Sequence, residues 1–288
     1  MRKAFLNGEI LPLTQASLPL NDLGLTRGYG VCEVLRSYNR LPHLAEQHLA
    51  RLQRSCLKVN LVLPYSAEKL LEAIHTLIAQ NVSGEASIKI VVTGGPTADG
   101  ISYEPAHTRV YITVEPFIPL PNTFYEEGVF LTLNEHQRQL PEVKTLNYLH
   151  AVANQSVKQA AGAFELLYHS KGELRESSTS NVMLIKGDSL ITPNQEILFG
   201  ITRGVVLELA KPHYRVEERT VLLSELGSAE EVFLTATNKD VLPVVRIGER
   251  HIGKGIVGPK TQHLLKLYRK STILARSGAP APSADQSG

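Results

Sequence analysis

"EPFIPLPNTFYEEG", residues 115–128, contains three prolines and separates two regions of different patterning. Proline fixes its own backbone angle and lacks an N–H group, so a proline cluster continues neither a helix nor a central strand. The stretch therefore predicts a linker between two domains. We expect a first domain over 1–118, a linker over 119–127, a second domain over 128–276 and a disordered, proline-rich tail over 277–288.

On the amino-terminal side of this linker, strand and helix patterns alternate. The pair Asn7-Gly8 predicts the tight turn of a hairpin, because these residues readily adopt positive φ angles. Apolar residues spaced three and four apart predict helices over 43–58 and 66–80, the second with a serine as its N-cap. Alternating residues predict a strand over 87–93.

The carboxy-terminal side continues the same mixture, so the expected fold class is α/β with two domains. The patterns predict strands and helices in this order: a strand over 129–134, a helix over 145–161, strands over 164–169 and 181–192, the latter turning at Gly187-Asp188, a helix over 202–210, a strand over 231–235 and a helix over 259–275.

Composition excludes several classes of function. The 30 basic and 28 acidic residues are interspersed, which predicts neither a nucleic-acid partner nor a membrane surface. The two cysteines, Cys32 and Cys56, form no disulfide framework, and no histidine stands in a metal-binding spacing, so we expect no metal. Without an export signal or a long apolar run, a cytoplasmic protein with a small-molecule partner is expected.

One segment suggests an anion site by its own pattern. "FGITRGVVLELA" turns at Gly200 and starts a helix near Thr202, where unpaired N–H groups could hold a phosphate. An ordinary capped helix is the alternative. No P-loop and no dinucleotide-binding glycine motif is present.

Seven short motifs occur together: "RGYGVCEVLRSYN", "HLARL", "EVKTLNYL", "RESSTSNVMLI", "LFGITRGVVLELA", "EVFLTATNKDVLPV" and "GIVGPKTQHL". Their order and spacing resemble those of the class IV, fold-type IV, pyridoxal-phosphate aminotransferases over nearly the whole chain. The resemblance implies a smaller N-terminal α/β domain and a larger C-terminal domain with a barrel-like sheet and helices. It also implies pyridoxal 5'-phosphate as cofactor and a homodimer whose active site lies near the interface.

The resemblance assigns the main cofactor contacts. Lys144 in "EVKTLNYL" matches the family's Schiff-base lysine, the catalytic residue, and an amine is the group that such chemistry requires. Glu176 matches the acid that faces the pyridine nitrogen, and Arg51 in "HLARL" matches the phosphate-binding arginine. Alone, Glu176 and Arg51 would be ordinary solvated residues.

Further contacts follow from the same motifs. Ile201 and Thr202 would bring backbone donors to the phosphate, and Thr237 in "FLTATN" resembles a second hydroxyl contact. Asn181 and Tyr148 are expected to support the ring or its phenolic oxygen.

Substrate preference depends on where the chain departs from the family. The Arg-x-His carboxylate trap of well-known D-amino-acid transaminases is replaced by "TGGPTADG". Arg27 and Arg175 are the predicted substitutes, and the family's dimer implies that Arg27 could serve either its own site or the partner's. A surface ion pair is the alternative for both arginines. Cys32 and Val34 are expected on the substrate side.

The expected reaction is therefore amino transfer between an amino acid, preferably a D-amino acid, and a 2-oxo acid such as 2-oxoglutarate or pyruvate. The alternatives are a branched-chain L-amino-acid aminotransferase, an aminodeoxychorismate lyase, and a non-catalytic binding protein on the same scaffold.

Overall fold

The computed structural model describes residues 1–276, which divide into two compact units. The first unit comprises Met1–Ile118 together with Val143–Tyr148. The second comprises Pro119–Glu142 and residues 149–276. The predicted tail over 277–288 lies outside the described residues.

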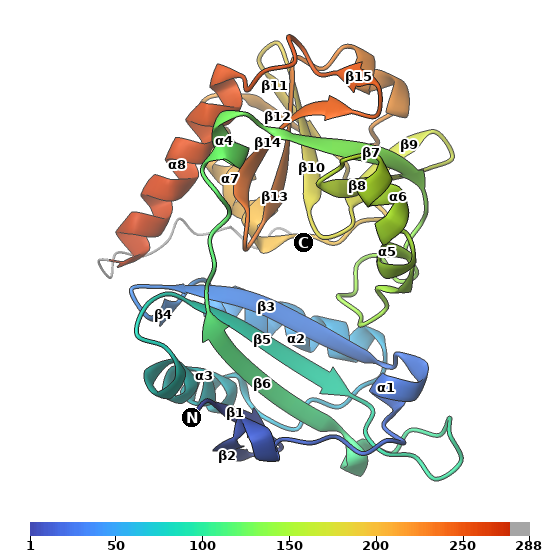
Figure 1. The fold of residues 1–288 in the computed structure, drawn as a ribbon, viewed down its shortest axis with the longest axis vertical. Coiled ribbons are helices and arrows are strands. Elements are labelled where there is room, and N and C mark those ends of the chain that lie inside the picture. Colours follow the sequence, from blue (N-terminus) through green and yellow to red (C-terminus); the bar gives the residue numbers. More distant parts are fainter. Residues whose placement is uncertain (277–288) are drawn as a thin grey trace. The chain divides into compact units, whose positions relative to one another are not determined.

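The first unit is a six-stranded sheet with two long helices (Figure 1). Its strands run in the order β2-β1-β6-β5-β3-β4. Its elements are β1 (Lys3–Leu6), β2 (Glu9–Pro12), α1 (Leu23–Arg27), β3 (Gly30–Tyr38), β4 (Leu41–Pro42), α2 (Ala45–Lys58), α3 (Ala67–Asn81), β5 (Ala86–Thr93) and β6 (Arg109–Pro116), with short 3-10 helices at Leu13–Gln15 and Pro105–His107.

The local sequence explains these elements. The hairpin between β1 and β2 turns at Asn7 and Gly8, both with positive φ, as predicted. Helix α3 begins after Ser66, whose side chain accepts a hydrogen bond from the N–H of Lys69, which confirms the predicted N-cap. The apolar faces of α2 and α3 pack with alternate residues of β3, β5 and β6 into one core.

The segment Val143–Tyr148 packs with the first unit, although the boundaries expected from the sequence place it in the second domain. Val143 is buried in the core of the first unit. The N–H of Leu146 donates to the carbonyl of Gly30, and Thr145 forms a bridge with Val31. Backbone pairing along β3 therefore holds this segment.

The second unit is built on a nine-stranded curled sheet in the order β12-β11-β10-β13-β14-β7-β8-β9, with β15 paired to β14 (Figure 1). Its elements are α4 (Thr123–Glu126), β7 (Val129–Glu135), α5 (Leu149–Ala153), α6 (Gln155–Ala160), β8 (Glu165–Ser170), β9 (Glu173–Ser177), β10 (Asn181–Lys186), β11 (Ser189–Thr192), α7 (Ile201–Ala210), β12 (Arg215–Glu218), the 3-10 helix η3 (Leu223–Gly227), β13 (Glu231–Ala236), β14 (Asp240–Ile247), β15 (Arg250–His251) and α8 (Pro259–Arg276).

Both faces of this sheet are covered by apolar side chains. Helices α7 and α8 pack on one face, where Phe233 and Tyr268 are buried. The other face encloses a second core that includes Leu167, Leu234 and Leu242. The nine-stranded curled sheet, with helices α7 and α8 packed on it, confirms the expected α/β class and the barrel-like sheet.

The prediction of one helix over 145–161 is wrong. Helical structure begins only at Leu149, and it is divided into two short helices. The backbone stays non-helical through Tyr148, because it pairs with β3, and the helices are the short α5 and α6. Asn154 separates them, and its side-chain amide donates to the carbonyl of His150 at 2.9 Å. Such a bond competes with regular helix formation.

Candidate active site

Lys144 lies on the segment that runs beside β3 in the first unit. Its carbonyl accepts a hydrogen bond from the N–H of Cys32 at 2.8 Å, and its own N–H lies 3.4 Å from the hydroxyl oxygen of Ser55. Its Nζ lies 3.5 Å from the hydroxyl oxygen of Tyr148. Burial acts to lower the pKa of the Lys144 amine, but Tyr148 and Cys32 raise it, and the resulting pKa is above the ordinary value.

Arg51 is held by a buried carboxylate in the first unit. Glu33 on β3 is fully buried and accepts two hydrogen bonds from Arg51 on α2, from Nε at 2.9 Å and from Nη2 at 2.6 Å. The Nδ1 atom of His48, also on α2, lies 2.9 Å from the same carboxylate. A bidentate pair of this kind fixes the plane of the guanidinium group.

The charges of this cluster follow from its contacts. Burial acts to raise the pKa of Glu33, but Arg51 and His48 outweigh it and hold that pKa far below its usual range. Burial lowers the pKa of His48 in spite of the neighbouring carboxylate, so the imidazole is neutral near pH 7. The cluster therefore contains one carboxylate, one guanidinium and one neutral ring.

Replacing Glu33 with glutamine should destabilise the protein by about 3–5 kcal/mol, because it leaves the buried Arg51 without its ionic partner. The folded-state pKa of Glu33 is lowered, so its contribution to stability is complete above the unfolded value of 4.5 and is lost as the pH falls below that value. Chemical denaturation at several pH values would measure both effects. An unchanged free energy of unfolding at pH 7 would contradict this account of Arg51.

Cys32 and Val34 lie on the opposite face of β3 from Glu33, because successive side chains of a strand alternate. Cys32 is a buried, free thiol whose Sγ lies 4.0 Å from the carbonyl oxygen of Thr145, and burial raises its pKa. Val34 is the next residue on that face and is partly exposed. These two side chains therefore share one face of β3, and the backbone of the Lys144 segment pairs with the edge of the same strand.

In the second unit, Glu176 is fixed at both carboxylate oxygens. Oε1 accepts a hydrogen bond from Nη1 of Arg138 at 2.6 Å, and Oε2 accepts one from the N–H of Leu198 at 3.1 Å. The residue is 5% exposed. These two hydrogen bonds fix the orientation of the carboxyl group.

The helix α7 begins with donors available for an anion. Its N-cap, Gly200, provides no side-chain hydrogen bond, and in the described chain the N–H groups of Ile201 and Thr202 have no hydrogen-bond partner. A β-carbon at Gly200 would collide with the side chain of Asn181, so only glycine allows this close approach. Asn181 donates to the carbonyl of Leu198 at 2.7 Å, which orders the approach to the helix.

Two buried hydroxyl groups add to these donors. Ser177, at the end of β9, and Thr235, opposite Asn181 across the β10–β13 pair, have side-chain hydroxyls with no hydrogen-bond partner among residues 1–276. Thr237 follows β13 in the turn to β14 and is partly exposed. Free N–H and hydroxyl donors, together with the fixed carboxyl group of Glu176 on β9, fit a group that combines a phosphate with a basic ring nitrogen.

The two arginines expected to bind a substrate carboxylate have different surroundings. Arg27, the last residue of α1, is exposed and forms no ion pair within the described part of the chain. Arg175 is buried, with Nη1 2.7 Å from Oε2 of Glu173 and Nε 2.8 Å from Oε1 of Gln137. It precedes Glu176 on β9, so the two side chains point to opposite faces of the strand.

The predicted site residues thus fall into two sets. The first unit contains Arg27, Cys32, Val34, Arg51, Lys144 and Tyr148, and the second contains Arg175, Glu176, Asn181, Ile201, Thr202 and Thr237. Sequence patterns missed the groups that orient these residues, namely Glu33, His48 and Arg138. Glu33 could have been noticed as a charged residue at a position of β3 where the neighbouring residues predict a buried side chain. The residues around Arg138 gave no indication that it contacts Glu176.

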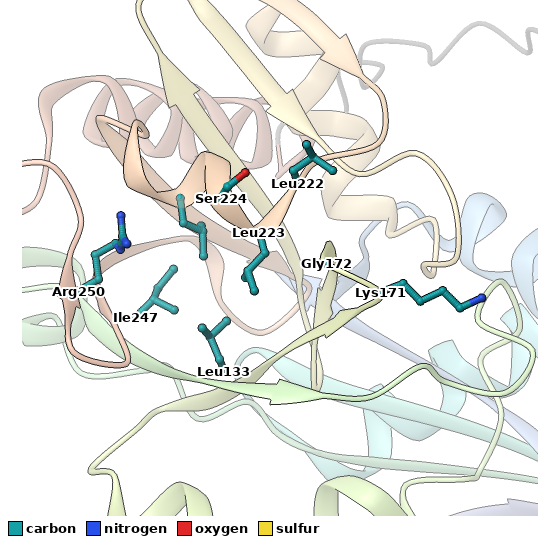
Figure 2. Close-up of a pocket in the computed structure, with 9 residues that line it drawn as sticks. Leu133, Lys171, Gly172, Leu222, Leu223, Ser224, Ile247 and Arg250 are labelled. Atoms are coloured by element: carbon teal, nitrogen blue, oxygen red, sulfur yellow. The ribbon is translucent and has the colours of Figure 1, made fainter.

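A separate hollow of about 610 Å³ lies in the second unit (Figure 2). Its walls are mainly apolar, from Leu133, Leu222, Leu223 and Ile247, and Arg250 and Lys171 lie at its sides. None of the predicted site residues lines it. Within residues 1–276, no group of three or more histidine, cysteine or acidic side chains could hold a metal, and every helix is too short or too polar to span a membrane.

Comparison with known proteins gives a consistent result. The model of the family described as "Amino-transferase class IV" matches residues 30–247. A D-alanine aminotransferase from Bacillus licheniformis is 30% identical over 276 residues, which cover 94% of this chain and 97% of that protein. A putative branched-chain-amino-acid aminotransferase from Methanocaldococcus jannaschii is 30% identical, covering 93% of this chain and 95% of the relative.

A solved structure extends the likeness to the fold. The branched-chain aminotransferase from the archaeon Thermoproteus uzoniensis, determined with norvaline, superimposes with a TM-score of 0.83 at 26% identity, covering 94% of this chain and 95% of that one. The matched family region contains Arg51, Lys144 and Glu176. The chain belongs to the class IV aminotransferase family and is a pyridoxal-phosphate-dependent aminotransferase with the fold-type IV architecture.

Proposed function

We propose that this aminotransferase holds its pyridoxal 5'-phosphate on Lys144, and that it transfers the amino group of a D-amino acid to a 2-oxo acid. The observation that carries the placement of the cofactor is the set of free donors at the start of α7, in the same unit as the fixed carboxylate of Glu176. When bound, the cofactor supplies a ring that accepts the negative charge developed at the substrate Cα.

The chain's own residues then have defined tasks. Lys144 holds the cofactor and afterwards moves the Cα proton, a role for which an amine with few competing contacts is suited. Glu176 keeps a proton on the ring nitrogen, because its ionised form favours a positive partner. Ile201, Thr202 and Arg51 bind the phosphate, with Arg51 oriented by Glu33.

A D-amino acid donor is supported by the relatives named D-alanine aminotransferase. The carboxylate of the amino acid needs a cation, and Arg27 has no acidic partner among the described residues. Arg175 is the second proposed cation, but it would first have to leave Glu173. We therefore assign the larger part of carboxylate binding to Arg27.

Replacing Arg27 with alanine should raise KM for the amino acid by about 10- to 100-fold, the effect of losing a hydrogen bond to a charged group. Arg27→Lys should recover part of this loss. The affinity for the cofactor should stay unchanged, because Arg27 belongs to the substrate contacts only. Steady-state kinetics with a cofactor titration would measure both quantities. Unchanged KM values in the Arg27→Ala and Arg175→Ala variants would reject the assignment of both arginines.

A branched-chain L-amino-acid aminotransferase is the second candidate, and it is favoured by the structural similarity to the Thermoproteus uzoniensis enzyme. The chirality of the preferred donor separates the two functions. Purified protein should be assayed with 2-oxoglutarate as acceptor for D-alanine and L-leucine, and with pyruvate as acceptor for D-glutamate and L-leucine. Faster turnover of the D-donors supports the proposal, whereas preferred turnover of L-leucine assigns the chain to the second candidate.

We also propose that the chain forms a homodimer through the segment that contains α1. Leu20 and Leu25 of this segment are 87% and 66% exposed, which is unusual for large apolar side chains placed so close together. Arg27 lies two residues further on. In a dimer of this kind, Arg27 would serve the partner's site. Light scattering on the purified protein tests the expected mass of two chains.

A further inference from the structure

Lys239 occupies a buried position that the predicted site residues leave unexplained. It lies in the turn between β13 and β14 and is 5% exposed. Its Nζ is 2.5 Å from Oε1 of Glu165, at the start of β8. It also donates hydrogen bonds to the hydroxyl oxygens of Thr179 at 2.6 Å and Ser180 at 2.9 Å. One ammonium group therefore connects three separate segments of the second unit.

Glu165 strengthens the same connection from the other side. Its carboxylate accepts hydrogen bonds from the N–H and the hydroxyl of Thr179, at 3.3 and 2.5 Å, and from the hydroxyl of Ser180 at 3.2 Å. The N–H of Ser177 donates to the carbonyl of Ser180 at 2.7 Å, which closes the turn. The turn over 177–180 is thus fixed by both members of a buried ion pair.

The two turns joined by Lys239 both carry residues of the proposed cofactor site. The turn over 177–180 connects Glu176, near the end of β9, to Asn181, at the start of β10. The turn of Lys239 itself contains Thr237. A shift of either turn would therefore move the acid or the hydroxyl that we assign to the cofactor.

A buried ion pair is weak evidence of a contribution to stability alone. Removing two charges from water costs about several kcal/mol per ion, and apolar replacements are often as stable. The Lys239–Glu165 pair instead favours one arrangement of the 177–180 turn and the turn between β13 and β14. In a buried site without water, each carboxylate oxygen and each ammonium proton needs a hydrogen-bond partner from the protein.

We propose that Lys239 is a positioning residue for the cofactor, acting through Glu165 and the 177–180 turn on Glu176 and Thr237. This inference rests on the proposed placement of the cofactor. It predicts that loss of the ammonium group weakens cofactor binding more than it weakens the fold.

The test is a titration of cofactor-free protein with pyridoxal 5'-phosphate, followed by absorption, with the thermal midpoint Tm measured in parallel. Lys239→Met should raise the Kd by about tenfold or more, comparable to the loss of groups that orient metal ligands. Lys239→Arg should recover part of the affinity. Lys260→Met is the matched control, because Lys260 pairs with Glu230 on the surface of the same unit at 3.1 Å. Its Kd should equal that of the unmodified protein.

Thr179→Val gives an independent readout, because it keeps both charges and nearly the same shape while removing one hydroxyl from the network. Its Kd should rise by about threefold or more, because the hydroxyl makes two hydrogen bonds, one to Glu165 and one from Lys239. Should Lys239→Met fail to fold, this variant decides the matter. The inference would be overturned if every variant that folds had a Kd within about twofold of the unmodified protein. The loss of one hydrogen bond is expected to change the Kd by more than that. Failure of the unmodified protein to bind the cofactor would instead overturn the proposed function.

Discussion

Replacing Lys144 with alanine should lower turnover by at least about 10⁴-fold, because one side chain both attaches the cofactor and moves the Cα proton. The fold should survive. In the first unit the amine contacts the Tyr148 hydroxyl at 3.5 Å, and the backbone of the segment is held by its pairing with β3. Initial rates with the preferred donor and a circular dichroism melt measure the two expectations.

Lys171→Ala is the matched control for this variant. Lys171 is an exposed lysine in the turn between β8 and β9, at the side of the hollow in Figure 2. It has no ion-pair partner among residues 1–276, so its loss should change neither rate nor stability. The role of Lys144 would be contradicted if the turnover of Lys144→Ala stayed within about tenfold of the unmodified enzyme. Loss of a general base is expected to lower the rate by about 10²-fold or more.

Replacing Glu176 with glutamine should lower kcat by at least about 10²-fold, the lower range for loss of an acid–base group. Glutamine keeps an acceptor for the N–H of Leu198, but it removes the negative charge that pairs with Arg138 and that would hold the ring nitrogen protonated. The ion pair is largely buried, so the free energy of unfolding should also fall, by about 3–5 kcal/mol. Rates and denaturant titrations measure these effects.

Glu173→Gln is the control that the same strand offers. Glu173 is the first residue of β9, before Glu176 in the strand, and pairs with Arg175. Its replacement should leave kcat unchanged. An equal fall of kcat in both variants would mean that the effect comes from the strand as a whole, which would contradict the specific role of Glu176.

Much of the fold could be predicted from local patterns. The hairpin at Asn7-Gly8, the cap at Ser66 and the turn near Gly187 depend on residues next to each other in the chain, and all three are present in the structure. The helix expected from residue 145 failed for the opposite reason. Residues 144–146 gain partners on β3, about a hundred positions away in the sequence, and this pairing overrides a helical pattern.

Strand β9 shows a second limit of local patterns. It contains Glu173, Arg175 and Glu176, charged residues that normally argue against a buried strand. Each of them finds an opposite charge, on the same strand or from Arg138. Because these partners come together only after folding, the strand and the orientation of its acid could not be predicted from the residues alone.

The residues of the candidate site could also be predicted only in part. The motif matches pointed to Lys144, Arg51 and Glu176, which we propose as site residues, but not to the buried groups that orient them. Glu33 holds Arg51 in the first unit, and Arg138 holds Glu176 in the second. A substitution at these supporting positions should therefore impair function almost as a substitution at the contact residues does.

The most direct test of the central claim is to reduce the purified, cofactor-loaded protein with borohydride and to map its peptides by mass spectrometry. The account predicts that the phosphopyridoxyl mass is retained on the peptide that contains Lys144 and on no other peptide. The label on another lysine, or no covalently retained cofactor at all, would contradict the assignment of Lys144 and the function proposed from it.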